Sequence, residues 1–376
     1  MTTEIHGVCD PRFGAVRDAF AANFEGGHEL GARFAFSVDG EMVVDLWAGW
    51  ADRKQTVPFD ERTLTLVFST TKAVAATMIA RLVEQGRLRW DQPVAEVWPE
   101  FAAQGKGAIT VEQVLSHQAG LPGFVEQIDP TLWYDPPTIV AMLAAKAPMW
   151  PPGSASGYHA LTVGYLVGEI FRRVDGRGLG TALREDITGP AGLDLWIGLP
   201  DSEHGRAADL KPPSALPQFG EVTDPKRAAF LSTWAGPSGR AGGDWRRIEV
   251  PSANGHATAE ALTRFMAALA TDGDIGGVHV LSPASVREMS RQRIRGQDLV
   301  LPFDMSWAAG FMRNEPNFFF GPTPTTIGHA GWGGSCAFAD PERGVAGSYV
   351  MNKQDVHLIG DPRSRRLIDA SYASPS

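Results

Sequence analysis

A serine and a lysine three residues apart make Ser69–Lys72 the segment of this chain best suited to chemistry. Residues i and i+3 of a helix lie on one face, so an amine here would lie beside a hydroxyl. Such an amine can act as the base for a serine nucleophile without help from a distant residue. Apolar side chains recur at helical spacing from Val74 to Leu82, which predicts that Ser69 lies at a helix N-terminus, where free N–H groups favour developing negative charge.

The motif is short, and an ordinary surface helix that begins with serine and carries a lysine would match it equally well. The remaining parts of a serine enzyme therefore decide between the two interpretations. Such an enzyme needs a second group that transfers protons and an oxyanion hole. The chain contains no Gly-x-Ser-x-Gly segment, which excludes the nucleophile turn of the α/β-hydrolases.

Tyr158 is the candidate for the second proton-transfer group. It follows Pro151–Gly157, a loop rich in proline and glycine, and precedes an apolar segment typical of a helix. A phenol has an ordinary pKa of about 10, so it accepts a proton at neutral pH only beside a cation, and Lys72 could be that cation. The alternative is a tyrosine that anchors the loop by burying its ring. The residues leave open whether Lys72 or Tyr158 is the general base.

The third candidate segment is Gly328–Ser335, whose glycines let the backbone pass close to a ligand and direct N–H groups at it. A backbone N–H group of this segment, together with that of Ser69, would complete an oxyanion hole. A plain turn or a β-bulge would also account for these glycines.

The elements that must position these segments follow from the hydrophobic pattern. A helix over residues 10–24 precedes two strand-like runs, Phe34–Val38 and Met42–Trp47, and Asp39-Gly40 between them predicts a hairpin. The middle of the chain alternates helices with loops rich in proline and glycine. Near the end, strands are expected at Ser306–Met312, Cys336–Ala339 and Gly344–Met351, followed by a helix over Arg363–Ala373. The pattern predicts an α+β fold in which a mostly helical segment is inserted into an antiparallel sheet built from both ends of the chain.

Composition limits the possible functions. Lys and Arg total 34 against 43 Asp and Glu, a net charge of −9, and no basic cluster occurs, so neither nucleic acid nor an anionic membrane is expected as a partner. The two cysteines, Cys9 and Cys336, cannot build a disulfide framework or a zinc site, and the nine histidines show no metal-ligand spacing. We expect no cofactor and no metal. No signal peptide or transmembrane run is evident, which predicts a cytoplasmic protein.

The three segments, in this order and at this spacing, resemble the serine β-lactamase and penicillin-binding protein superfamily. More closely, they resemble its family VIII carboxylesterases, which share the fold of class C β-lactamases. Ser69-x-x-Lys72 matches the first motif of that family, and Tyr158 matches the tyrosine of the second. His329-Ala330-Gly331 stands where the β-lactamases have Lys-Thr-Gly, and Trp332-Gly333-Gly334 matches the Trp-Gly-Gly of the esterases.

The resemblance implies a single β-lactamase-like domain over residues 1–376. An α/β subdomain would cover approximately residues 1–62 and 250–376, and a helical subdomain approximately residues 63–249. It also implies a cleft between them in which substrate meets residues of the glycine-rich segment and apolar walls. The expected substrate-binding residues are His329, Gly331, Trp332, Gly333, Phe124 and Trp150.

Two departures from the family pattern bear on the substrate. Ala160 replaces the asparagine of the second motif, and His329 replaces the lysine that helps to hold a substrate carboxylate. A largely neutral imidazole supplies no fixed positive charge at pH 7, so anionic penicillins and peptide C-termini should bind weakly.

The predicted function is hydrolysis of short-chain, neutral carboxylic esters through an acyl-enzyme on Ser69, with a small-molecule ester as substrate. The backbone N–H groups of Ser69 and Trp332 are expected to bind the oxyanion. The alternatives are an acyltransferase on the same scaffold, a β-lactamase or D-Ala peptidase, and an inert binding member of the fold. The sequence carries no signal for the oligomeric state.

Overall fold

A nine-stranded antiparallel sheet runs through the molecule in the computed structural model, which describes residues 3–232, 234–235 and 244–374. Strands from the two ends of the chain share this sheet, with β2 hydrogen-bonded to β14 near its middle. The strands, in spatial order, are β1 (Ile5–Cys9), β3 (Glu41–Gly49), β2 (Gly31–Val38), β14 (Val345–Met351), β13 (Cys336–Asp340), β12 (Ile327–Ala330), β11 (Met312–Arg313), β10 (Asp304–Trp307) and β9 (Ile294–Gln297).

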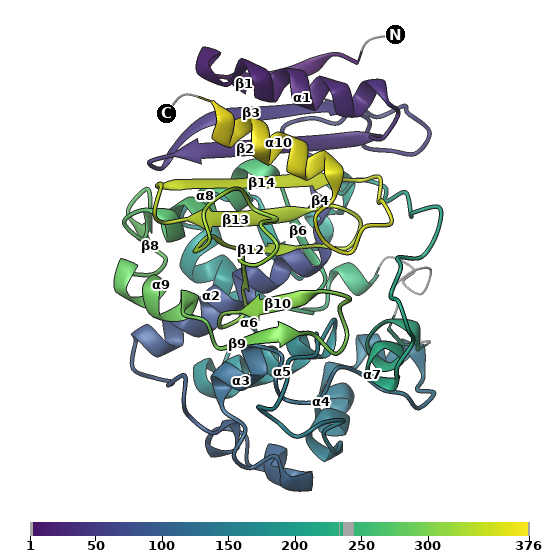
Figure 1. The fold of residues 1–376 in the computed structure, drawn as a ribbon, viewed down its shortest axis with the longest axis vertical. Helices are drawn as coiled ribbons and strands as arrows, with labels where there is room; N and C mark the ends of the chain where they lie inside the picture. Colours follow the sequence, from purple (N-terminus) through teal and green to yellow (C-terminus); the bar gives the residue numbers. More distant parts are fainter. Residues whose placement is uncertain (1–2, 233, 236–243, 375–376) are drawn as a thin grey trace.

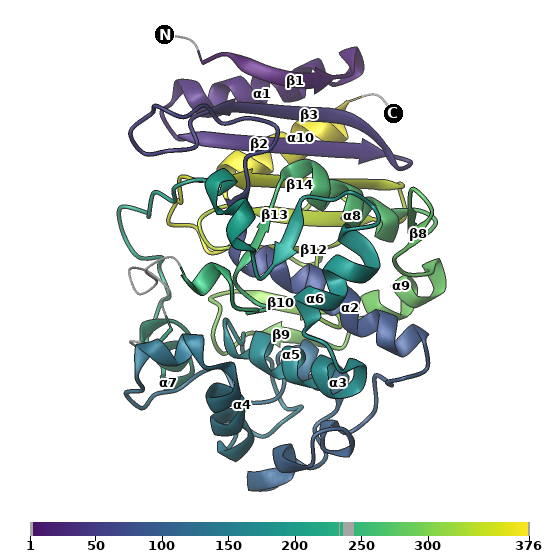
Figure 2. The same cartoon turned by 180° about the vertical axis from the view of Figure 1, so that it is seen from behind.

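Helices cover both faces of the sheet (Figure 1). The first and last helices, α1 (Gly14–Glu25) and α10 (Pro362–Ala373), pack together on one face, and both termini lie at that end of the molecule. On the other face α8 (Ala259–Ala270) packs against β14, β13 and β2 (Figure 2). Helix α8 begins where the Thr258 hydroxyl accepts a hydrogen bond from the N–H of Ala261, and ten of its twelve residues are buried.

The segment between the two groups of strands is mostly helical, and part of it lies beyond the β9 edge of the sheet (Figure 1). Its longest helices, α2 (Thr71–Glu84) and α5 (Thr162–Asp175), pack against each other, and α2 also contacts β12. The other helices are α3 (Val111–Leu115), α4 (Pro136–Ala145), α6 (Leu179–Leu183), α7 (Asp224–Lys226) and α9 (Pro283–Ser290). A small sheet joins β4 (Thr65–Leu66), β6 (Gly255–Ala257) and β5 (Leu195–Ile197), and β7 (Asp274–Ile275) pairs with β8 (Val278–His279).

This arrangement confirms the predicted α+β fold with a helical insertion. The hairpin is also confirmed, because β2 and β3 flank Asp39 and Gly40, whose φ angles of 49° and 82° suit a type I′ turn. The predicted helix over Arg363–Ala373 is α10. The division into subdomains near residues 62 and 250 remains a prediction; β4 and β6, which lie on opposite sides of it, pair with each other.

One predicted strand is wrong. Ser306–Met312 is not a single strand, because β10 ends at Trp307 and β11 begins at Met312 on the neighbouring position of the sheet. Gly310, with a φ of 83°, reverses the chain between them. An apolar run shows burial but does not show where a buried chain turns.

In the part of the chain that the structure describes, no helix has the length and apolar content needed to cross a membrane.

Candidate active site

Ser69 lies in a tight helical turn, Phe68–Thr70, that leads directly into α2. Phe68 has a φ of 43°, a left-handed conformation that a bulky residue adopts only under strain. The Thr71 hydroxyl donates a hydrogen bond to the Phe68 carbonyl and stabilises the turn. Ser69 is the one partly exposed residue between Thr63 and Ala80, so its hydroxyl is presented at the edge of an otherwise buried segment.

Lys72 lies one helical turn further and is almost fully buried, at 4% exposure. Its Nζ is 2.9 Å from the Ser69 Oγ, 2.7 Å from the Ala160 carbonyl oxygen and 2.9 Å from the Ser252 carbonyl oxygen. Burial lowers the pKa of Lys72 well below its ordinary value, and no carboxylate is among the causes of that shift. If Lys72 is a neutral amine whose two N–H groups are accepted by the two carbonyls, its lone pair is directed at the Ser69 hydroxyl.

Tyr158 forms a side-chain hydrogen bond with Ser69, which by itself lowers the pKa of the phenol. Burial has the larger effect and raises the pKa of Tyr158 above its ordinary value. The Lys72 Nζ lies 4.8 Å from the centre of the tyrosine ring. The lowered pKa favours the amine form of Lys72, which can accept a proton, and the raised pKa favours the phenol form of Tyr158, which can donate one.

The glycine-rich segment passes directly beside the Ser69 turn. The Ser335 hydroxyl donates to the Val67 carbonyl at 2.9 Å and lies 3.2 Å from the Thr70 Oγ1. A Cβ atom on Gly331 would lie 2.2 Å from the Val67 carbonyl oxygen, so only glycine permits this approach. The Gly331 carbonyl accepts from the N–H of Gly334 at 3.2 Å. In a trans peptide the N–H of Trp332 must then point the opposite way, out of the turn.

A cavity of about 50 Å³ opens beside Ser69 and Tyr158. Among its described lining residues none carries a charge, and the polar side-chain groups are the hydroxyls of Ser69 and Tyr158 and the indole N–H of Trp332. The lining residues are Phe68, Ser69, Tyr158, Ala160, Leu161, Phe230, Ala235, Ala253, Leu301, Met312, Ala330, Trp332, Leu358 and Ile359.

Of the residues expected to bind substrate, Trp332 is in this lining. Phe124 packs instead against Trp234, with ring centroids 5.2 Å apart, and Trp150 lies against His159 at 5.8 Å. His329 is fully buried, 6.1 Å from the ring of Tyr158, and burial lowers its pKa to about 3. Gly331 and Gly333 shape the loop beside the cavity rather than its described wall.

Several residues of the site escaped the sequence analysis. The carbonyl groups of Ala160 and Ser252 contact Lys72 from 88 and 180 residues away, and every residue has a carbonyl, so residue type gives no signal for them. The walls formed by Phe230, Leu301 and Leu358 belong to ordinary apolar segments. Ala160, noted only as a departure from the family pattern, supplies both a wall and a hydrogen-bond acceptor.

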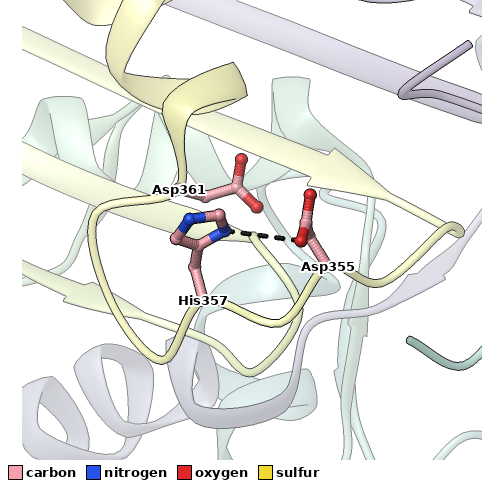
Figure 3. Close-up of side chains that lie close together, drawn as sticks. All are labelled: Asp355, His357 and Asp361. Carbon is pink, nitrogen blue, oxygen red and sulfur yellow. Dashed lines mark ion pairs between the residues drawn. The ribbon is translucent and has the colours of Figure 1, made fainter. Parts of the chain in front are cut away.

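The described residues include one cluster with metal-ligand side chains: Asp355, His357 and Asp361 (Figure 3). The His357 Nδ1 lies 3.4 Å from an Asp355 oxygen. Asp361, however, accepts hydrogen bonds of 3.0 and 2.8 Å from the guanidinium of Arg363, which already supplies its positive partner. The cluster is therefore part of an ion-pair network, and it gives no support to a metal site.

The fold is that of a β-lactamase-type protein. The chain belongs to the Beta-lactamase family, whose model matches residues 16–370. It is 35% identical over 364 residues to the esterase/beta-lactamase LipL of Mycobacterium tuberculosis, covering 93% of this chain and 83% of that protein.

Two solved structures are similar over almost the whole chain. A penicillin-binding protein homolog from Caulobacter crescentus has 64% identity and a TM-score of 0.97, covering 99% of this chain and 100% of that one. A family VIII carboxylesterase has 41% identity and a TM-score of 0.92, covering 98% and 99%. The resemblance stated from the motifs is thereby confirmed.

Proposed function

We propose that this protein is a serine carboxylesterase that hydrolyses short-chain, neutral esters through an acyl-enzyme on Ser69. The observation that carries the proposal is the environment of Lys72, whose buried Nζ lies within hydrogen-bond distance of the Ser69 hydroxyl and of two backbone carbonyls, and whose pKa is lowered by burial. The esterase names of LipL and of the family VIII carboxylesterase support the same reaction class.

In the acylation step, Lys72 takes the proton of Ser69 while the serine oxygen forms a bond to the ester carbonyl carbon. The backbone N–H groups of Ser69 and Trp332 stabilise the oxyanion that results. When the carbon–oxygen bond to the leaving group breaks, Tyr158 gives its proton to the departing alkoxide and regains one from the Lys72 ammonium. The alcohol leaves, and the acyl group stays on Ser69.

Deacylation runs through the same groups in reverse. Water attacks the acyl carbonyl carbon and gives up a proton to Lys72 by way of Tyr158. The bond to the Ser69 oxygen then breaks, the serine regains its proton from Lys72, and the carboxylic acid is released. No other titratable side chain is needed.

The cavity supports the substrate class. Its described wall is uncharged and its volume is about 50 Å³, which suits a small apolar acyl group. His329 occupies the position of the family lysine but is buried and held neutral, because burial lowers its pKa to about 3. A substrate carboxylate would lose its water there without gaining a cationic partner.

Hydrolysis of p-nitrophenyl esters from acetate to dodecanoate tests the proposal, with nitrocefin, an anionic β-lactam, measured in parallel. We expect turnover to be highest for the short chains, slow for nitrocefin, and at least about 1000-fold lower in Ser69→Ala. Ser371→Ala is the matched control, since its buried hydroxyl donates only to the Leu367 carbonyl within α10. Retained activity in Ser69→Ala would contradict the assignment of the nucleophile, and preferred turnover of nitrocefin would contradict the substrate class.

A further inference from the structure

Asp298 is a buried carboxylate directly beneath the loop that carries Tyr158. It follows β9, is 3% exposed, and accepts five hydrogen bonds from neutral donors. These donors are the N–H groups of Tyr158, Val300 and Leu301, each at 2.9 Å, the Ser156 hydroxyl at 2.9 Å and the Trp307 indole N–H at 3.2 Å.

The charge of Asp298 has no cationic partner among the residues that the structure describes. Fixed N–H and O–H dipoles take the place of a counterion. Burying a carboxylate in this way is costly unless every lone pair is used, and here five donors share two oxygens. Ser156 belongs to the loop that carries Tyr158, Trp307 stacks on the tyrosine ring, and Leu301 lines the cavity. The carboxylate is therefore surrounded by parts of the site.

Asp298 fixes Tyr158 from two directions. Its Oδ1 holds the tyrosine backbone through the N–H group. Its Oδ2 holds the indole of Trp307, which lies parallel to the tyrosine ring at 7° with centroids 5.7 Å apart. The same Oδ1 also accepts from the N–H of Leu301, a wall of the cavity. One carboxylate thus fixes the position of the Tyr158 backbone, the orientation of its ring through Trp307, and the Leu301 wall of the cavity.

We propose that Asp298 is the positioning residue for Tyr158, holding the phenol where its proton reaches both the Ser69 oxygen and the leaving alkoxide. This inference rests on the proposed esterase function. The charge of Asp298 also acts in the same sense as burial, since it raises the pKa of Tyr158 and keeps the phenol protonated as a donor.

The leaving group of the ester separates this role from a general loss of structure. An alkoxide must be protonated as it departs, whereas p-nitrophenolate leaves without a proton. In Asp298→Asn the amide oxygen can replace one carboxylate oxygen, but its NH₂ group then meets the Trp307 N–H, a donor facing a donor. We expect kcat/KM to fall about 30-fold for ethyl butyrate and less than about threefold for p-nitrophenyl butyrate.

Tyr158→Phe supplies the second comparison. If Asp298 acts through the phenol, adding Asp298→Asn to Tyr158→Phe should change kcat/KM for ethyl butyrate by less than about twofold. Asp340→Asn is the matched control, because Asp340 is equally buried and accepts from the Tyr372 hydroxyl at 2.9 Å and the Glu342 N–H at 3.2 Å, between β13 and α10. It should affect the two esters equally.

If Asp298→Asn does not fold, Ser156→Ala provides a milder test. It removes one hydrogen-bond donor to Asp298 and leaves the carboxylate in place. It should show the same preference for p-nitrophenyl butyrate with a smaller amplitude. Equal losses on both esters, or a full additional loss on the Tyr158→Phe background, would overturn the role of Asp298. Wild-type protein that hydrolyses neither ester would instead overturn the proposed function.

Discussion

At the scale of the residue, the proposed site depends on a lysine whose charged form is disfavoured by burial. Lys72 is surrounded by carbonyls, a hydroxyl and aromatic rings, and the buried histidines nearby have lowered pKa values themselves. In the unfolded chain the same lysine would be protonated at neutral pH. Each unit by which folding lowers its pKa costs about 1.4 kcal/mol of stability below that pKa. Reactivity and stability therefore oppose each other at this position.

The first prediction concerns that cost and uses Lys72→Gln, whose amide can still donate to the two carbonyls. The pKa of Lys72 is lower in the folded state than in the unfolded state, so the unfolded chain binds more protons between the two values and stability rises with pH across that window. The free energy of unfolding of wild type should therefore increase relative to Lys72→Gln from pH 7 to pH 10, as measured by urea denaturation. Parallel pH profiles for the two proteins would show that Lys72 is charged in the fold. Ester hydrolysis by the variant should be lost.

At the scale of the element, the last helix reaches back to the site. Arg363 in the first turn of α10 donates to the Gly333 carbonyl at 2.7 Å, next to Trp332. The same guanidinium pairs with Asp361 and with Glu29, whose side chain is fully buried and whose pKa burial raises to about 7. The guanidinium of Arg363 therefore connects the N-terminal part of the chain, the C-terminal part and the glycine-rich loop of the site.

The second prediction follows from this meeting point. Arg363→Gln leaves two buried carboxylates unpaired, which should lower the free energy of unfolding at pH 8 by about 3–5 kcal/mol. The deficit should shrink toward pH 5, because an unpaired buried carboxyl has a raised pKa and is then protonated in the fold. In the folded protein kcat for p-nitrophenyl butyrate should fall about tenfold, as the Trp332 N–H loses its fixed position.

Arg33→Gln is the comparison for that experiment. Arg33 is buried to a similar degree and pairs with Asp45 through two hydrogen bonds of 2.6 Å between β2 and β3, without contacting the glycine-rich loop. It should lower stability while leaving kcat of the folded protein within about twofold of wild type. An equal loss of kcat in both variants would remove the special role of the Arg363–Gly333 contact.

At the scale of the whole molecule, the structural features that could be predicted from the sequence are those fixed by residues adjacent in the chain. The Asp39-Gly40 hairpin and the helix caps at Thr110, Thr258 and Ser282 are local patterns, and the structure has all of them. The motifs at Ser69 and Tyr158 were also readable, and the fold brings them together. The division of Ser306–Met312 into two strands could not be predicted from the sequence. The turn at Gly310 depends on close packing against Ala76, which is distant in the chain.

The sequence did not predict the residues that contact and position the side chains of the motifs. The carbonyls that hold Lys72 and the carboxylate beneath Tyr158 come from segments 88, 180 and 140 residues away. Their residue types, alanine, serine and aspartate, are common everywhere in the chain. Only the closed topology, in which strands from both ends share one sheet, brings them to the site.

The most direct test of this account is to trap the acyl position. Wild type, Ser69→Ala and Lys72→Gln would be treated with ethyl p-nitrophenyl butylphosphonate, an uncharged diester. A reactive serine displaces p-nitrophenolate from its phosphorus and keeps a stable ethyl butylphosphonyl group, which peptide mass spectrometry of a digest would detect. We expect one adduct, on the peptide containing Ser69, with stoichiometric release of p-nitrophenol, and no adduct in either variant. An adduct on another residue, or rapid ester hydrolysis by a protein that forms none, would contradict it.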